Sequence, residues 1–407
     1  MNPEDKYKHL AKAASAFSPS APINSADLFA GRTRQVDRAT TALFQRGQHV
    51  ILFGERGVGK TSLANTIYDL LYSALAENDV RFARFNCYGS VQFSDLWRGI
   101  LREFHIDSYR SVAGFDQSQS RSQRTTLDCL LPENIGPEDV RYALGQVPYT
   151  TILVIDEVDR IENKATTTLL ADTIKSLSDH SVDATIILVG VADSVDQIIA
   201  EHKSIERALV QIQMPRMSSV ELAEIIEKGL KRAEMKMESQ AKEDIVRLSQ
   251  GLPHYTHSLS LHAAQTAINQ CRTDILIQDV DNAIRAAVGT AQQSLVSAHH
   301  RAISSPRENL YQQVLLACAL AHTDELGYFS AVDVRYPMSQ IMGRPYEIPA
   351  FSRHLNDFCE EARGPVLQKT GQARRFRFRF LNPLMEPFVI MKGLTGGLIT
   401  REIADAY

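Results

Sequence analysis

The sequence predicts an α/β protein with a parallel sheet and helices on both faces, followed by a helical region and a smaller C-terminal region of helices and a hairpin. Short apolar segments alternate with helix-compatible stretches between residues 49 and 213. One segment, Ile152–Ile155, has four apolar residues in succession, which is typical of a strand buried on both faces of a sheet. After Pro215 the pattern changes to amphipathic helices, which begin with residues 219–233.

The first predicted strand, His49–Phe53, leads directly into a glycine-rich loop. Residues 54–61, GERGVGKT, fit the pattern G-x-x-x-x-G-K-[ST], and a helix-compatible stretch follows them. The backbone N–H groups of such a loop can surround a phosphate, and the next helix adds its positive N-terminal end. A glycine turn without a ligand is the alternative. We predict that the loop binds ATP through Gly54, Gly57, Val58, Gly59, Lys60, Thr61 and Ser62.

Two acidic residues complete the predicted chemistry. Asp156 and Glu157 follow the buried strand at its carboxyl end, where α/β sheets place their ligands. Lys60 would contact the β- and γ-phosphates, whereas the Thr61 hydroxyl would bind Mg²⁺. Asp156 suits a direct or indirect ligand of Mg²⁺, and Glu157 suits the base that polarises the attacking water. Charges that only cap a buried strand are the alternative.

Other segments of the core carry weaker indications. A further buried strand, Ala184–Gly190, precedes Asp193 and Ser194. A polar side chain there could sense the γ-phosphate; Asp193 is the first candidate, Ser194 the second, and a helix N-cap is compatible with both. The arginines of Val80–Asn86 place that strand at or near the sheet edge. The polar sequence of residues 107–135 has no periodicity and predicts a disordered insertion on the surface.

Composition changes divide the chain. Ala, Ser and Pro dominate the N-terminus, and a charged stretch separates residues 299–309. Phe29 and Gly31, ahead of the first strand, suit either a contact with adenine or the entry to a helix. We predict a flexible N-terminal arm over 1–24, an ATPase core over 25–214, a helical lid over 215–298, a winged-helix domain over 306–393 and a C-terminal tail over 394–407.

The winged-helix prediction rests on element order. Helices are expected over Leu310–Ala321 and Ala350–Arg363, and a hairpin follows over Val366–Lys369 and Arg374–Phe380. In its second strand phenylalanines alternate with arginines, which would contact DNA phosphates or protect a sheet edge. These arginines are Arg375, Arg377 and Arg379. The acidic side of the second helix would repel DNA; it carries Asp357, Glu360 and Glu361.

Composition limits the classes of protein. The net charge of −4 argues against a generally basic protein that coats nucleic acid. The five cysteines include no C-x₂-C pair, which argues against a zinc site or a disulfide framework. We therefore expect a protein of a reducing compartment. No apolar run approaches the ~20 residues of a membrane span, and the N-terminus lacks the apolar core of a signal peptide. We expect a soluble cytoplasmic protein that does not bind membranes.

The motifs together resemble those of a known family. GERGVGKTSL, LVIDEVDRI, VGVADS and a helical lid with GLP resemble AAA+ ATPases of the origin-recognition/initiator type. They are similar also to the transposition-regulator and STAND ATPases. The resemblance covers about residues 25–390. It implies a nucleotide between core and lid, and homo-oligomers whose subunits complete each other's sites. Lys60, Thr61, Asp156, Glu157 and Asp193 match the family's functional positions.

Two further roles are implied by the resemblance. Arg207, just before the fifth strand, falls where an arginine finger would enter the site of the adjacent subunit; a surface arginine is the alternative. Initiator lids usually carry a sensor arginine, whereas this chain has the sequence GLPH over residues 251–254. This departure is closer to the STAND pattern, and it implies that Pro253 packs on the nucleotide.

Two functions are compatible with these features. The first is an ATP-hydrolysing switch that assembles with ATP and couples its cycle to duplex DNA through the winged helix. The second is an ATP-dependent adaptor whose acidic helix binds a partner protein without DNA. The family's members act in replication initiation, in transposition and in mobile-element or phage-defence systems, and the sequence does not choose among these. A protein-unfolding motor is disfavoured because residues 87–105 lack an aromatic-hydrophobic-glycine pore loop.

Overall fold

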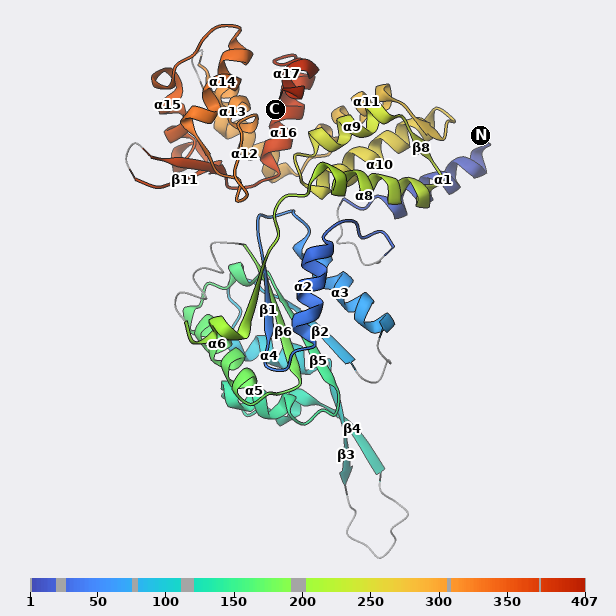
Figure 1. Cartoon of the computed structure of the whole chain (residues 1–407), viewed down its shortest axis with the longest axis vertical. Helices are drawn as coiled ribbons and strands as arrows, with labels where there is room; N and C mark the ends of the chain where they lie inside the picture. The colour runs from blue at the N-terminus through green and yellow to red at the C-terminus, as the bar shows by residue number, and fades with distance from the viewer. Residues whose placement is uncertain are drawn as a thin grey trace, which may run out of the picture.

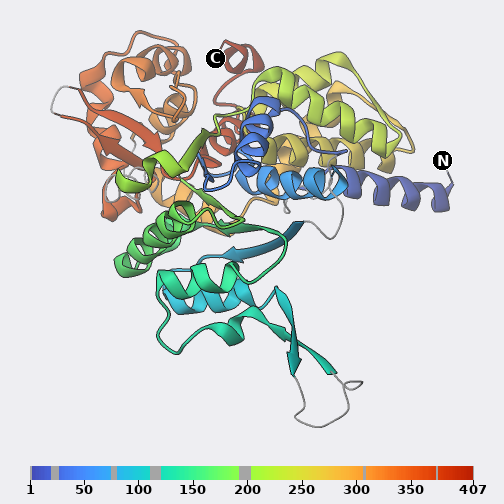
Figure 2. The same cartoon turned by 60° about the horizontal axis from the view of Figure 1, so that its bottom comes forward.

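The chain forms an α/β core, a helical lid and a C-terminal region (Figure 1). The lid and the C-terminal region lie side by side at one end of the core, as a second view confirms (Figure 2). The structure, a computed structural model, describes residues 2–19, 27–74, 80–110, 121–191, 203–305, 309–372 and 375–406. No helix in these ranges combines the length and the apolar character that crossing a membrane requires.

The core is built around a parallel sheet with the spatial strand order β2-β5-β6-β1-β7. Its strands are β1 (His49–Phe53), β2 (Val80–Asn86), β5 (Thr150–Asp156), β6 (Ala184–Gly190) and β7 (Leu209–Gln213). The helices of the core are α2 (Thr33–Leu43), α3 (Lys60–Ala74), α4 (Phe93–Leu101), α5 (Pro137–Leu144) and α6 (Lys164–Asp179), with 3₁₀ helices η1 (Leu127–Leu130), η2 (Val158–Arg160) and η3 (Lys203–Ala208).

Burial on both faces of the sheet confirms the predicted fold class. Alternate residues of β5 pack in two separate hydrophobic clusters. Ile152 and Val154 join the cluster that includes α3 residues, whereas Leu153 and Ile155 join the cluster that includes α4 and α6 residues. Strand β2 lies at the sheet edge, as its arginines indicated.

The polar insertion contains an ordered hairpin. Strands β3 (His105–Arg110) and β4 (Arg121–Thr126) pair antiparallel, from His105 opposite Thr126 to Arg110 opposite Arg121. Figure 1 shows this hairpin projecting away from the rest of the core. The expected lack of order is therefore wrong for these strands. Cross-strand backbone hydrogen bonds order them without the apolar periodicity that sequence patterns detect.

The N-terminal segment also differs from the prediction. Residues Pro3–Ala16 form helix α1, which packs against the lid instead of forming a flexible arm. Ala13, Ala16 and Phe17 are buried in this contact. The Phe17 ring lies so close to Gly229 that a Cβ there would come within 2.2 Å of it. Small residues on both sides let the helices approach closely, and this tertiary packing orders a segment with little apolar content.

The lid is a bundle of helices that begins with α8. A capping box of Ser218 and Glu221 is present at its start. The lid elements are α8 (Ser219–Ala233), β8 (Lys236–Met237), α9 (Ser239–Leu248), α10 (Pro253–Asn269), β9 (Asp274–Ile275), α11 (Ile277–Gly289) and α12 (Gln293–Ile303).

The C-terminal region combines helices with a three-stranded antiparallel sheet of order β10-β12-β11. Its elements are α13 (Tyr311–Ala319), β10 (Phe329–Ser330), α14 (Ala331–Met342), α15 (Ile348–Asp357), η4 (Glu361–Arg363), β11 (Leu367–Thr370), β12 (Arg377–Phe380), α16 (Met385–Thr395) and α17 (Arg401–Asp405). Phe378 and Phe380 are buried and Arg377 is exposed, as the alternation predicted.

Two expectations for this region were wrong. The helix expected over Ala350–Arg363 begins at Ile348 and ends at Asp357, and a 3₁₀ helix follows it. The expected tail instead contains α17, whose Arg401 pairs with Asp244 and Asp281 of the lid. Ion pairs between elements more than a hundred residues apart leave no local pattern in the sequence.

Candidate nucleotide-binding site

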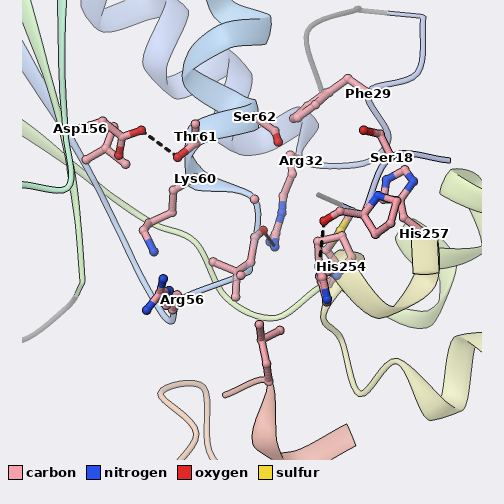
Figure 3. Close-up of a pocket in the computed structure, with 18 of the residues that line it drawn as sticks. Ser18, Phe29, Arg32, Arg56, Lys60, Thr61, Ser62, Asp156, His254 and His257 are labelled. Atoms are coloured by element: carbon pink, nitrogen blue, oxygen red, sulfur yellow. Dashed lines mark hydrogen bonds between the residues drawn. The ribbon is translucent and has the colours of Figure 1, made fainter. Parts of the chain in front are cut away.

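A cavity of about 790 Å³ lies where the core, the lid, the segment after α1 and the C-terminal region meet. In Figure 3, Lys60, Thr61 and Asp156 lie at one end of the cavity, whereas Ser18 and His257 lie at the other. Two ends of different chemistry, one charged and one with aromatic and apolar side chains, fit a nucleotide with its phosphates at the first end and its base at the second.

The glycine-rich loop has the conformation that its sequence predicted. Gly57 and Gly59 have φ of +87° and +94°, a region that glycine enters without steric cost. Gly54 lies at the base of the loop and not on the cavity wall, and a Cβ there would come within 2.3 Å of the Met214 carbonyl oxygen. Helix α3 begins at Lys60, so the loop leads directly into a helix N-terminus.

Lys60 is folded back on the loop. Its Nζ donates to the carbonyl oxygens of Gly54, at 3.1 Å, and Glu55, at 2.7 Å. Burial lowers the pKa of Lys60 to about 8, although the nearby Asp159 and Asp156 oppose this shift. The positive charge of the buried ammonium group is thus only partly balanced by the protein until an anion enters the loop.

This pKa predicts a pH-dependent affinity for ATP. Phosphate binding favours the charged form of Lys60, so the affinity should be highest below the free protein's pKa and fall above it. Between pH 7.5 and 9.5 the charged fraction falls from about 0.8 to about 0.03, which predicts about 25-fold weaker binding. Titration calorimetry over this range measures the change. The Lys60→Arg variant stays charged and should show a flat profile; a flat profile in the unaltered protein would contradict the assignment.

The Thr61 and Asp156 side chains meet at the phosphate end. Thr61 Oγ1 donates to Asp156 Oδ2 at 2.8 Å, and the Glu157 backbone N–H donates to Oδ1 at 2.8 Å. Arg84 of β2 also donates to Oδ2, at 2.7 Å. Hydroxyl and carboxylate oxygens are the ligands that Mg²⁺ prefers, so this pair fits that ion. Because protein donors already contact both oxygens of Asp156, the carboxylate suits an indirect ligand better than a direct one.

Sequence reasoning missed the role of Arg84. Its Nη1 also donates to Asn65 Oδ1 of α3 at 3.0 Å, so the guanidinium joins three elements around Asp156. The only signal in the sequence was an arginine on a strand beside the acidic one. Arg84 therefore orients the Asp156 carboxylate through a charge-assisted hydrogen bond.

Glu157 lines the cavity next to Asp156. Its backbone is left-handed, with φ of +57° and ψ of +39°. Its carboxylate is half-exposed and accepts a hydrogen bond from Arg160 Nη1 at 2.8 Å. Strained conformations of this kind cluster at active sites. The carboxylate is therefore held at the mouth of the cavity, where water has access.

The base end is formed by the segment before α2 and by helix α8. Phe29 lines the cavity, which fits the adenine-contact interpretation of this segment. The Gly31 N–H donates to Glu224 at 3.0 Å, and the Arg32 N–H donates to Glu221 at 2.9 Å. These contacts attach the segment to the lid, so a movement of α8 would carry Phe29 with it.

Arg32 is a second residue that sequence reasoning missed. It is only 3% exposed, and its Nη2 donates to the carbonyl oxygens of Val58, at 3.1 Å, and Pro215, at 2.5 Å. The contact with Val58 connects this buried residue of the loop to the segment that forms the base end of the cavity. Burial lowers the pKa of Arg32, and Glu221 opposes this shift.

The lid contributes the start of α10. Pro253 lines the cavity, and its Cγ lies 3.9 Å from the position that a Cβ on Gly59 would occupy. His254 makes a hydrogen bond of 2.8 Å between its Nδ1 and the Pro19 carbonyl oxygen. Pro253 thus lies beside the glycine loop, while His254 contacts the N-terminal segment.

A buried ion cluster joins the loop to the lid and the C-terminal region. Arg216 donates to Glu55 of the loop at 2.6 Å and to Glu386 of α16 at 2.7 and 2.8 Å. All three side chains are largely buried. Beside them, Leu384 lines the cavity and lies against Gly57. We call Glu55, Arg216 and Glu386 the interdomain cluster.

The remaining candidates lie elsewhere. Asp193 and Ser194 fall outside the described residues. Ser62 lines the cavity. Arg207 is exposed in η3 and does not line the cavity of its own chain. Arg377 and Arg379 belong to β12 and Arg375 precedes this strand, and none of the three lines the cavity.

Comparison with known proteins identifies the fold. Residues 43–199 match the family model of the AAA domain. A Walker-type ATPase of Pyrococcus abyssi aligns with a TM-score of 0.52 and 16% identity over 91% of this chain and 98% of that chain. The ORC2 protein of Aeropyrum pernix, solved in ADPNP–ADP complexes, aligns with a TM-score of 0.51 and 15% identity over 93% and 95%. No curated protein matches the sequence. The core has an AAA+ P-loop fold.

Proposed function

We propose that the protein is an ATP-hydrolysing switch that assembles with ATP and couples its nucleotide cycle to duplex DNA through its C-terminal region. The observation that carries the proposal is the cavity in which Lys60, Thr61, Asp156 and Glu157 converge beside a glycine loop. This set can bind a nucleoside triphosphate and activate water against its γ-phosphate.

Each residue has a defined part in this proposal. Lys60 neutralises charge on the β- and γ-phosphates, and Glu157 orients and polarises the attacking water. Thr61 would hold Mg²⁺ directly and Asp156 through water, and the ion would neutralise phosphate charge. Arg207 would act on the site of a neighbouring copy, since it does not reach its own cavity. Asp193 stays the first candidate for the γ-phosphate sensor.

The C-terminal region supports the coupling to DNA. Its order of helices, hairpin and three-stranded sheet supports the winged-helix interpretation. Helix α15 ends at Asp357, so Glu360 and Glu361 lie beyond the helix and not on its face. Asp357 itself accepts a hydrogen bond from the Tyr311 hydroxyl at 2.6 Å. Of the acidic residues that disfavour DNA binding, Glu360 and Glu361 therefore lie outside the helix, and Asp357 is engaged in a hydrogen bond with Tyr311.

An adaptor function has one observation in its favour. Two of the three wing arginines already have partners in the protein: Arg377 pairs with Asp324, and Arg379 donates to Gln368 at 2.8 Å. Arg375 is exposed. If the arginines stay in these contacts, the C-terminal region would bind a partner protein in place of DNA. The mobile-element or phage-defence context rests on the resemblance alone.

ATP turnover with and without duplex DNA tests the proposal. We expect DNA to stimulate turnover and to bind with strong salt dependence. Replacing Arg375, Arg377 and Arg379 with Ala should abolish the stimulation and reduce the slope of log K against log salt by about 2 to 3 units, because about one counterion is released for each phosphate contact.

The matched control replaces three exposed arginines outside the C-terminal region, Arg46, Arg232 and Arg285, with Ala. This variant has the same net charge as the wing variant and should keep the stimulation. If both variants keep the DNA affinity and the salt slope of the unaltered protein, the wing assignment is wrong. Turnover that is indifferent to DNA would favour the adaptor.

A further inference from the structure

Two buried polar atoms at the base end of the cavity have no partner. His257 is 6% exposed and Arg32 is 3% exposed. His257 Nδ1 and Arg32 Nε make no hydrogen bond within the described part of the chain. Both residues line the cavity, and Figure 3 shows them near its Phe29 end. Buried polar atoms without partners are rare in native proteins and call for an explanation such as a missing ligand.

The neighbours of His257 fix its ring. Helix α10 carries His254 and His257 three residues apart, so both face the segment after α1. His254 is engaged there with the Pro19 carbonyl oxygen. The Phe17 ring meets the His257 ring edge-on at a centroid distance of 6.3 Å. His257 therefore cannot turn its Nδ1 to another partner without disturbing the packing of α1.

The hydrogen-bonding capacities of the two side chains follow from their chemistry. Burial lowers the pKa of His257 to about 4, so the imidazole is neutral near pH 7 and one of its nitrogens is an acceptor. Arg32 Nε–H is always a donor. One donor and one acceptor complement adenine, which presents an acceptor nitrogen beside its exocyclic amino group. Guanine presents two acceptors, N7 and O6, along the corresponding edge.

We propose that His257 and Arg32 read the base of the bound nucleotide and select adenine over guanine, with His257 Nδ1 accepting from the 6-amino group and Arg32 Nε–H donating to a ring nitrogen. The proposal rests on the proposed function, since it requires a nucleoside triphosphate in the cavity. It assigns base selection to a lid helix that α1 holds in place. Neither residue was a candidate from the sequence.

A comparison of three triphosphates tests the contact of His257. Purine riboside triphosphate lacks the 6-amino group and otherwise matches ATP, whereas GTP carries the acceptor O6 in place of that donor. We expect the unaltered protein to bind ATP about tenfold more tightly than purine riboside triphosphate, and GTP more weakly than ATP. Equal affinities for ATP and purine riboside triphosphate would overturn the proposal, and this arm needs no variant.

The His257→Phe variant completes a double-mutant cycle. Phe keeps a ring against Phe17 but lacks the acceptor. We expect it to lose about tenfold in affinity for ATP and to bind purine riboside triphosphate as the unaltered protein does. Equal losses for both ligands would show a merely structural role and overturn the proposal. His262→Phe, the same change on the same helix but away from the cavity, should bind all three ligands normally.

The contact of Arg32 is tested on the ligand. 1-Deaza-ATP and 7-deaza-ATP each lack one ring nitrogen, and we expect one of them to bind about tenfold more weakly than ATP. Binding of both with the affinity of ATP would overturn the role of Arg32. If the unaltered protein binds none of these triphosphates, the proposed function itself fails, which is a different result from binding without base preference.

Discussion

Replacing Glu157 by Gln should lower the rate constant of ATP hydrolysis by about 10²- to 10⁴-fold while leaving ATP affinity within about twofold. The amide has the same shape as the carboxylate but cannot accept a proton from water. Glu157 lines the cavity in a left-handed conformation, held by Arg160, so the substitution leaves its surroundings in place. Single-turnover hydrolysis and equilibrium binding of ATP measure the two quantities separately.

Glu162→Gln provides the matched control. It is the same chemical change five residues later, and the side chain does not line the cavity. We expect hydrolysis within about twofold of the unaltered rate. If Glu157→Gln hydrolyses ATP at the unaltered rate, Glu157 is not the base. Attention would then move to Asp159, the other acidic residue after β5 that lines the cavity.

Replacing Arg216 by Met should reduce the free energy of unfolding by about 3–5 kcal/mol, because two buried carboxylates would lose their shared cation. Arg216 donates to Glu55 and Glu386, and Glu386 is almost wholly buried. Burial raises the pKa of Glu386, and Arg216 opposes this shift. Without the guanidinium, Glu386 would have to take up a proton or leave its site, and α16 would loosen from the loop.

Urea unfolding measures this effect. Arg46→Met removes an exposed arginine that lies 3.5 Å from Asp183, and it should cost less than about 1 kcal/mol. Adding Glu386→Gln to Arg216→Met should recover part of the loss, since it removes one of the unpaired charges. A loss no larger than that of Arg46→Met would mean that the interdomain cluster does not stabilise the fold.

Local patterns predicted much of the core and of the phosphate end of the site. Strands His49–Phe53 and Ala184–Gly190 have the predicted bounds, because a parallel sheet needs apolar runs with turn residues at their ends. Lys60, Thr61, Asp156 and Glu157 converge, because the carboxyl ends of β1 and β5 lie at the same edge of one parallel sheet, on either side of β6. In both cases the interactions that determine the structure connect residues that are close in sequence or that lie at the same edge of the sheet.

The missed features depend on contacts between distant segments. Arg216 lies 161 residues from Glu55 and 170 residues from Glu386, and nothing in the sequence around it marks the contact. Helix α1 is ordered by the lid and not by its own composition. His257 looked like one of many polar residues on α10, and only the cavity shows that its Nδ1 lacks a partner.

The position of α16 against the glycine loop has a consequence for biosynthesis. Domains generally fold in order as a chain leaves the ribosome. The loop and the sheet of this protein can form early, but Leu384 and Glu386 complete the cavity wall and the interdomain cluster. A nascent chain that has not reached residue 386 therefore has an open site in which Arg216 lacks one of its two carboxylate partners. The wall of the cavity is therefore completed only late in synthesis, after residue 386 has been added.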